Sequence, residues 1–168
     1  MKISVGPRGV LEIDDAQICY KNFAGKGSPY NREGERNFSV VIPDRELADR
    51  LVADGWNVRI REPKVVGEEP FMHLPVKVKF NDFGPEVCLE SGKAKAFLNE
   101  DTVACLDNAR LSQIDLTIRP YDWKLATGKS GRAAYLQDMY AVQSVSRFAD
   151  RWDDIEPDFG DDDLPFDM

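Results

Sequence analysis

The chain has 168 residues, of which 42% are hydrophobic and 31% charged, a balance typical of globular proteins rather than of disordered or fibrous ones. Its apolar runs are far shorter than the roughly 18 residues that a membrane span needs. The N-terminus also lacks the apolar segment of a signal peptide. We therefore expect a cytoplasmic protein without membrane association, folded as one domain with a tail.

Charge is distributed very unevenly along the chain. Residues 1–149 contain 21 Lys or Arg and 21 Asp or Glu and sum to zero, whereas residues 150–168 contain one Arg against nine acids and sum to −8. The net negative charge of the chain therefore lies in the C-terminal segment, and the neutral body can still carry a basic face. Because apolar residues in that segment are isolated, we expect 150–168 to be a disordered tail outside a domain of residues 1–149.

The first half of the chain predicts two strands and a helix. Residues 10–20 are strand-like, and residues 38–42 form a β-branched run that stops at Pro43. Asp44 is then expected to cap a short amphipathic helix that ends at Gly55. The apolar face of this helix consists of Leu47, Ala48, Leu51 and Val52.

The rest of the body predicts more strands. Apolar and polar residues alternate over 56–60 and 74–80, with basic residues on the outer side, and again over 114–118 before Pro120. A last strand is expected near 134–142 and a short helix at 98–106. This pattern predicts a mainly β fold with one or two short helices and long loops, which a five-stranded barrel accommodates.

Two loops combine glycines, cations and aromatic rings. The first spans 21–36 and the second 119–132, and the face of a predicted strand adds two more lysines. Cations neutralise phosphates and exposed rings stack on bases of any sequence, so the pattern indicates binding of a nucleic-acid strand. Each loop alone also fits a solvated hairpin loop. The candidate contacts are Lys21, Phe23, Lys26, Tyr30, Arg32, Arg36, Lys77, Lys79, Arg119, Tyr121, Trp123, Lys124, Lys129 and Arg132.

Catalytic and metal sites lack support in the sequence. The three cysteines are widely spaced and are expected to be buried, reduced thiols, and His73 is the only histidine. Gly128-Lys129-Ser130 lacks the upstream glycine of a phosphate-binding loop. The acidic pairs 14–15 and 68–69 have neither a histidine nor a second acidic motif beside them. We therefore expect no enzyme activity, no metal and no cofactor.

The C-terminal end carries the most specific motif. An acidic run is followed by an aliphatic residue, a proline and a phenylalanine: Asp161, Asp162, Asp163, Leu164, Pro165 and Phe166. This resembles the C-terminal tip of bacterial single-stranded DNA-binding proteins, which docks into basic-rimmed apolar pockets on replication and repair proteins. The resemblance implies recruitment of such partners through these six residues. One departure is that Asp167 and Met168 follow the phenylalanine, which is terminal in the bacterial tip.

The body resembles single-stranded DNA-binding proteins of bacteriophages. The residues that carry this likeness lie in 22–38, 54–58 and 118–123. The resemblance implies an OB-fold body, with no catalytic activity, that coats single-stranded DNA in phage replication, recombination or repair. It places the protein in the host bacterial cytoplasm and leaves open a homo-oligomer. The alternative is an adaptor that binds replication proteins through its tail without useful affinity for nucleic acid.

Overall fold

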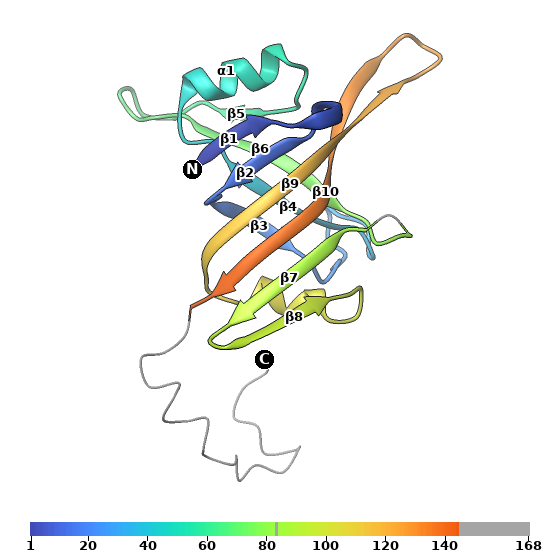
Figure 1. Cartoon of the computed structure of the whole chain (residues 1–168). Coiled ribbons are helices and arrows are strands. Elements are labelled where there is room, and N and C mark those ends of the chain that lie inside the picture. Colours follow the sequence, from blue (N-terminus) through green and yellow to red (C-terminus); the bar gives the residue numbers. More distant parts are fainter. Residues whose placement is uncertain (83, 145–168) are drawn as a thin grey trace.

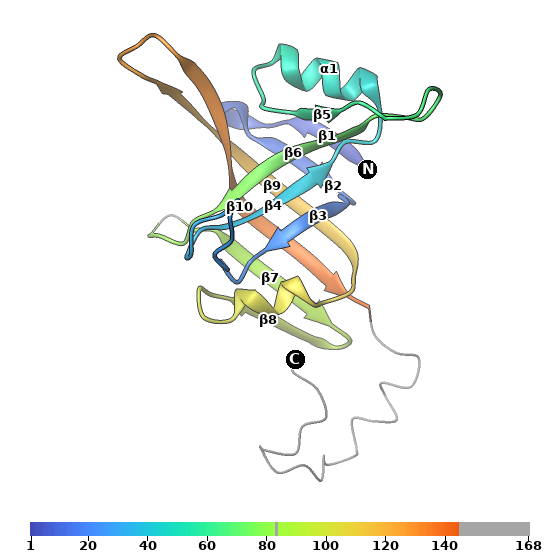
Figure 2. The ribbon, with the colours of Figure 1, turned by 180° about the vertical axis from the view of Figure 1, so that it is seen from behind.

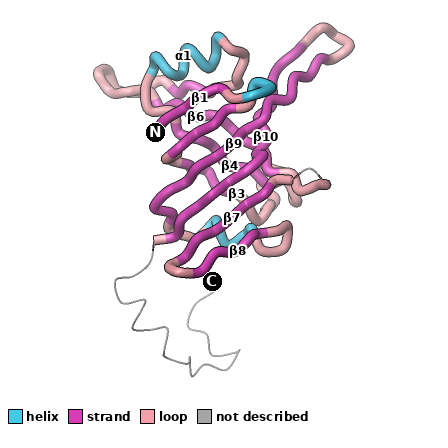
Figure 3. Tube along the Cα trace, viewed as in Figure 1, coloured by secondary structure: helices cyan, strands magenta, loops and turns pink. Residues whose placement is uncertain are grey.

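Alternating buried and exposed side chains build a strongly β-rich structure (Figures 1 and 3). The computed structural model describes residues 1–82 and 84–144. The elements, in chain order, are β1 (Lys2–Val5), a 3₁₀ turn (Pro7–Gly9), β2 (Leu11–Asp14), β3 (Ile18–Asn22), β4 (Arg36–Val41), α1 (Arg45–Ala53), β5 (Arg59–Arg61), β6 (Phe71–Val78), β7 (Glu86–Ser91), β8 (Ala94–Leu98), a second 3₁₀ turn (Val103–Asp107), β9 (Leu111–Lys124) and β10 (Ser130–Gln143).

A bend between β2 and β3 closes the sheet into a barrel. The strand order runs β1-β2-β9-β10-β6-β4-β3, so the consecutive strands β2 and β3 lie far apart in the sheet, β3 at one edge and β2 next to the edge strand β1 at the other. Residues of the bend bond to both neighbouring strands: the Ala16 amide donates to the Ile114 carbonyl at 2.8 Å, and the Val41 amide donates to the Gln17 carbonyl at 2.8 Å. Counting β2 and β3 as one bent strand gives the five-stranded OB barrel that we expected, in which β6 and β10 are parallel.

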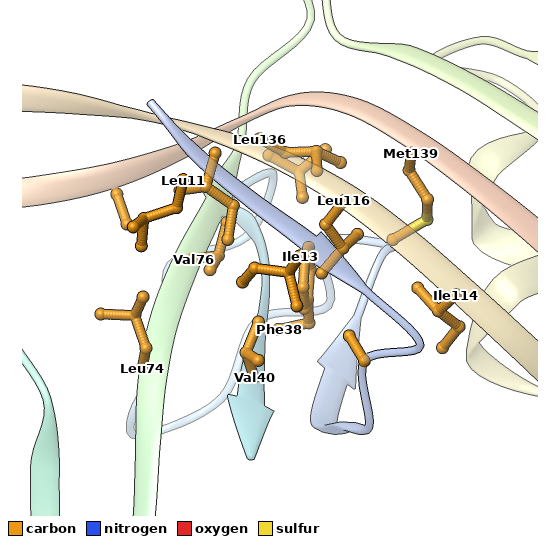
Figure 4. Close-up of a cluster of buried hydrophobic side chains, with 14 of the residues drawn as sticks. Leu11, Ile13, Phe38, Val40, Leu74, Val76, Ile114, Leu116, Leu136 and Met139 are labelled. Atoms are coloured by element: carbon orange, nitrogen blue, oxygen red, sulfur yellow. The ribbon is translucent and has the colours of Figure 1, made fainter. Parts of the chain in front are cut away.

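The barrel interior is filled by side chains from facing strands (Figure 4). Phe38 and Val40 from β4 meet Leu74 and Val76 from β6, and all four are at most 1% exposed. The inner faces of β2, β9 and β10 complete the cluster with Leu11, Ile13, Ile114, Leu116, Ile118, Leu136 and Met139. Because side chains alternate along a strand, burial of this set fixes which side chains face outward.

The predicted helix is confirmed as α1 (Figure 1). The Asp44 carboxylate accepts a hydrogen bond from the Leu47 amide at 2.7 Å, which caps the first turn. Ala48 and Leu51 are buried on its inner face. Trp56 follows the helix and is 2% exposed, so this tryptophan is a core residue, as its position after the helix stop predicts.

Several predicted boundaries are wrong. The strand expected over 10–20 is broken at Asp15, which has a φ of 54°, so that its two parts pair with different strands. The segment 98–106 is a strand end and a 3₁₀ turn rather than an α-helix, and the strand expected from 56 is restricted to 59–61. The cysteines were expected to be buried, but Cys19 and Cys88 are half-buried and Cys105 is exposed; all three thiols are free.

The second predicted loop is also largely strand. Residues up to Lys124 belong to β9 and residues from Ser130 belong to β10. The two strands form a long hairpin arm that projects from the barrel (Figures 1 and 2). Among the described residues, no helix is of the length and apolarity that crossing a bilayer requires. The expected tail of residues 150–168 lies outside the described part of the chain.

Replacing Phe23 or Tyr30 by alanine tests the division between core and surface within one loop. Phe23 is fully buried and Tyr30 is 98% exposed. We expect Phe23→Ala to lower the free energy of unfolding by about 3–5 kcal/mol, because it leaves a cavity. Tyr30→Ala should change it by less than about 0.5 kcal/mol. Urea unfolding followed by circular dichroism measures both, and equal losses would contradict the assignment.

Candidate nucleic-acid interface

Strand register sets four outward side chains in a row across β4, β6, β10 and β9. Asn37 lies opposite Lys77, Lys77 opposite Tyr135, and Tyr135 opposite Arg119. Their sequence neighbours Phe38, Val76, Val78, Ala134, Leu136 and Ile118 are buried. The row therefore lies on the outer surface of the barrel, held by the packing beneath it.

Tyr135 is the centre of this row. The Lys77 ammonium lies 5.9 Å from the centroid of its ring and the Arg119 guanidinium carbon 5.1 Å from it. The Tyr121 ring meets it edge-on, at 6.1 Å between centroids. One aromatic ring between two cations can stack on a base and neutralise the phosphates on both sides of it.

Two adjoining hollows share Lys77. The first, with a volume of about 270 Å³, is lined by Gly34, Arg36, Asn37, Lys79 and Tyr135 among others. The second, with a volume of about 470 Å³, is lined by Trp56, Arg59, Trp123, Lys129 and Arg132 among others. We call the two together the barrel groove. It runs from the β3–β4 loop to the β9–β10 arm, so the two basic segments predicted from the sequence lie at its two ends.

The β3–β4 loop is ordered by one asparagine. The Asn31 side-chain amide donates to the carbonyls of Lys26, Arg32 and Glu35, each at 3.0 Å. Its oxygen accepts from the Asn37 side chain at 2.8 Å, which joins the loop to the row of outward residues. Tyr30 beside it is 98% exposed. The loop therefore presents an unpacked ring from a fixed backbone.

The arm places Trp123 against a glycine. Gly131 lies opposite Trp123 in the hairpin. A Cβ atom at Gly131 would lie 2.6 Å from the Cζ2 atom of the tryptophan ring, a separation that requires the ring to move. The absence of a side chain at Gly131 therefore lets Trp123 lie flat across the hairpin, at the wall of the barrel groove.

Arg132 connects the arm to the end of α1. Its Nε donates to the Asp122 carboxylate at 2.7 Å, and its Nη1 donates to the Asp54 carbonyl at 2.8 Å. The guanidinium also lies 5.1 Å from the centroid of the Trp56 ring. Because its charge is already paired, we assign Arg132 to holding the arm rather than to binding phosphate.

Three further predicted contacts have structural roles. Phe23 is fully buried and stacks on Phe38, with 5.2 Å between ring centroids, so it is not available to a ligand. The Lys21 ammonium donates to the Leu106 and Ala109 carbonyls at 2.9 and 3.3 Å. The Arg36 side chain is 18% exposed and lies 3.7 Å from the Glu100 carboxylate. Sequence patterns identified these residues as cationic or aromatic but could not show their partners.

The remaining predicted cations have no such partners. Within residues 1–82 and 84–144, none of them forms an ion pair: Lys26, Arg32, Lys77, Lys79, Lys124, Lys129 and Arg119. Those described ranges also hold no cluster of His, Cys, Asp or Glu that would bind a metal ion. The six tip residues from Asp161 to Phe166 lie outside them.

A second group of rings lies on the outer face of β3 and β6. The Tyr20 ring lies 5.3 Å from His73 and 6.1 Å from Phe71, and Tyr20 is 59% exposed. His73 also makes a 2.9 Å hydrogen bond with the Ser39 hydroxyl. Partial burial, and then the charge of Arg59, lower the pKa of His73, so its ring is neutral near pH 7 and suited to stacking.

Tyr20, Phe71, His73 and Tyr135 were not among the contacts predicted from the sequence. Those predictions were limited to cations and rings of the two glycine-rich segments, 21–36 and 119–132, and to the lysines of β6. The alternation along β6 already placed Phe71 and His73 on the same face as Lys77 and Lys79. Tyr135, in contrast, lies on β10, and only the pairing of β10 with β6 and β9 brings Lys77 and Arg119 to it.

Comparisons with known proteins concern the fold and the family of the chain. A family model described as "Putative phage ssDNA-binding domain" matches residues 4–165. A single-stranded DNA-binding protein from bacteriophage Enc34, solved in complex with ssDNA, is similar with a TM-score of 0.53 and 12% identity, covering 88% of this chain and 93% of that one. Its C-terminally truncated form gives a TM-score of 0.52 and 10% identity, covering 87% and 97%.

A weaker likeness is to gp2.5, a single-stranded DNA-binding protein encoded by bacteriophage T7, with a TM-score of 0.41, 12% identity and coverage of 90% and 97%. No curated protein sequence matches the chain. At these identities the two Enc34 structures support the fold, and the family model supports the family over nearly the whole chain. The chain belongs to the phage ssDNA-binding domain family, a family of binding proteins rather than enzymes.

Proposed function

We propose that the protein binds single-stranded DNA in the barrel groove, without sequence preference and without a cofactor. The observation that carries the proposal is the position of Tyr135 between Lys77 and Arg119, at 5.9 and 5.1 Å from its ring centroid. A base stacked there has a phosphate-binding cation on each side. The face of an OB barrel formed by its second and third strands, with the loops beside it, is also where such folds bind oligonucleotides.

The path of the strand follows from the placement of the exposed and half-buried rings of this surface. Trp123 and Tyr121 lie on the arm, Tyr135 at the centre, Tyr30 on the β3–β4 loop, and Tyr20 on the neighbouring strand β3. Lys77 and Arg119 lie on the two sides of Tyr135, and none of the contacts requires a particular base. Duplex DNA should bind more weakly, because its bases are already stacked on one another. In the host cytoplasm, such a protein would coat and protect strands during phage replication, recombination and repair.

The C-terminal segment has a separate role in the proposal. Its net charge of −8 makes it a polyanion tethered to a body with unpaired cations, so it competes with DNA for them. Its last residues, Asp161 to Phe166, supply an acidic run and an apolar tip for partner proteins of the replication machinery. Asp167 and Met168 follow this tip.

A salt titration with two variants tests the interface. The logarithm of the affinity for a single strand should fall with the logarithm of salt concentration by about 0.7 per neutralised phosphate. Lys77→Ala should reduce that slope by about 0.7. Tyr135→Ala should weaken binding by about 1–3 kcal/mol at every salt concentration with the slope unchanged, and Tyr135→Phe should bind like wild type. Fluorescence anisotropy measures these values.

Two results would decide against the interface. Equal affinity for single and double strands would remove stacking from the explanation. Absence of any measurable affinity for single strands would favour the adaptor instead, which binds only through its tail. Thermal melts of each variant, Tyr135→Ala above all, serve as the control, because a half-buried ring also contributes to packing.

Gly131→Ala tests the placement of Trp123. The new methyl group would lie 2.6 Å from a ring atom, so the ring must leave its position and binding to single strands should weaken about as much as in Trp123→Ala. The double variant should lose no more than either single variant, because both act on one ring. Ser130→Ala, an exposed neighbour, is the matched control. Additive losses would show that Gly131 acts through something other than Trp123.

Deletion of residues 150–168 tests the tail. We expect affinity for single strands to be unchanged or higher, with a gain that shrinks as salt screens the competition. Capture of replication proteins should be lost. Phe166→Ala retains every charge and should abolish capture while leaving DNA affinity at the wild-type value. If truncation destroyed DNA binding, the tail would have to be part of the binding body.

A further inference from the structure

A second groove lies at the other end of the β9–β10 hairpin. It has a volume of about 460 Å³ and is formed by the outer faces of β2, β9, β10, β7 and β8. Register places Glu12 opposite Thr117, Thr117 opposite Asp138, and Asp138 opposite Glu86. We call this hollow the acidic groove, since five of its lining residues are carboxylates: Glu12, Asp14, Glu86, Asp115 and Asp138.

One side of the acidic groove is apolar. Phe97 is 76% exposed and lies opposite Cys88, which lies opposite Tyr140. Phe97 belongs to β8, and among the described strands β8 pairs only with β7, so its other edge is open. The five carboxylates form no ion pair with any residue of the described ranges. Asp115 accepts a hydrogen bond from the Asp15 amide at 2.9 Å. A partner complementary to this surface would be basic and carry an apolar side chain.

The tip of the β9–β10 arm has both properties. Before Tyr135 and beyond Ile118 the two strands pair only with each other, so the arm projects from the barrel (Figure 2). Its tip carries Lys124, Lys129 and Leu125, which is 52% exposed. The turn is closed by hydrogen bonds between Leu125 and Lys129 at 2.7 Å and between Gly128 and Leu125 at 3.0 Å.

We propose that the arm tip of one copy docks into the acidic groove of the next copy along a DNA strand. Leu125 would pack on Phe97, and the two lysines would face the carboxylates. The occupant is a second copy of this chain, because the arm and the groove are complementary in charge and in apolar content. This inference rests on the proposed function, since it describes neighbouring copies on single-stranded DNA.

Geometry gives the contact a direction. The arm and the groove are different surfaces at opposite ends of the same two strands, so the contact is head-to-tail and continues as an open row rather than closing as a pair. Arg132 fixes the direction of the arm through its bonds to Asp122 and Asp54. An open row is the assembly that suits a linear ligand.

The contact should be weak without DNA. A hairpin tip in one groove buries far less than the roughly 1,000 Å² of a stable interface, so copies in free solution should remain separate. On one strand, neighbours reach an effective concentration on the order of millimolar, at which a weak contact is populated. The expected result is cooperative binding to long strands.

The test compares short and long oligomers of thymidine with the full-length protein. An oligomer of about 8 nucleotides holds one copy, and one of about 60 holds several. Leu125→Glu and Phe97→Glu should each leave affinity for the short oligomer within about twofold of wild type and lower the preference for occupied neighbours by about tenfold or more. Lys124 and Lys129 are not used, because they also belong to the proposed DNA interface.

A mixing experiment shows whether the arm of one copy meets the groove of another. Leu125→Glu keeps an intact groove and Phe97→Glu keeps an intact arm, so on an oligomer of two sites the mixture should recover cooperativity that neither variant shows alone. Val66→Glu, at a fully exposed valine of the β5–β6 loop, is the control and should behave as wild type. The inference would be overturned if both variants bound long oligomers as cooperatively as the wild type, or if the wild type showed no cooperativity. If the wild type did not bind the short oligomer at all, the proposed function would be overturned as well.

Discussion

The parallel pairing of β10 with β6 at Tyr135 and Lys77 is the contact on which the barrel and its proposed site both depend. It joins the β2-β9-β10 half of the sheet to the β6-β4-β3 half. The bend at Ala16 and Gln17 then closes the ring on the other side. Because the interior is filled by large apolar side chains, neither strand can slip by one residue without turning its core residues toward water. The same register that protects the core therefore sets Tyr135 between its two cations.

The β9–β10 hairpin connects the different properties of the molecule. Its inner side chains fill the barrel, and its outer side chains change character along the strands. Asp115 and Asp138 lie at one end, whereas Arg119 and the lysines of the tip lie at the other. A body with no net charge therefore has two strongly charged regions, and net charge alone would have concealed both. Arg132 fixes the direction in which the hairpin projects. It donates hydrogen bonds to Asp122 and to the Asp54 carbonyl at the end of α1, and its guanidinium lies over the Trp56 ring.

In this protein the same residue types occur in the core and on the proposed binding surface. Phe23 and Tyr30 lie in one glycine-rich loop, yet Phe23 is buried and Tyr30 is exposed. Trp56 and Trp123 line the same groove, but Trp56 belongs to the core. Cations divide in the same way: Lys21 and Arg132 bond to backbone carbonyls, while Lys77 and Lys129 have no ion-pair partner among the described residues. Composition identifies the candidate residues for DNA binding, and only the contacts of each side chain show which of them belong to the core and which are available to a ligand.

The sequence by itself predicted the class of fold, the capped helix α1, the basic face of β6, the core position of Trp56 and the separation of a neutral body from an acidic segment. These are local properties, set by the alternation of side chains along a strand and by the charge of neighbouring residues. It did not predict the break at Asp15, the arm, Tyr135 as a centre, or the acidic groove. Each of these arises where strands distant in the sequence become neighbours, and such neighbours are chosen by the packing of the whole core rather than by any single segment.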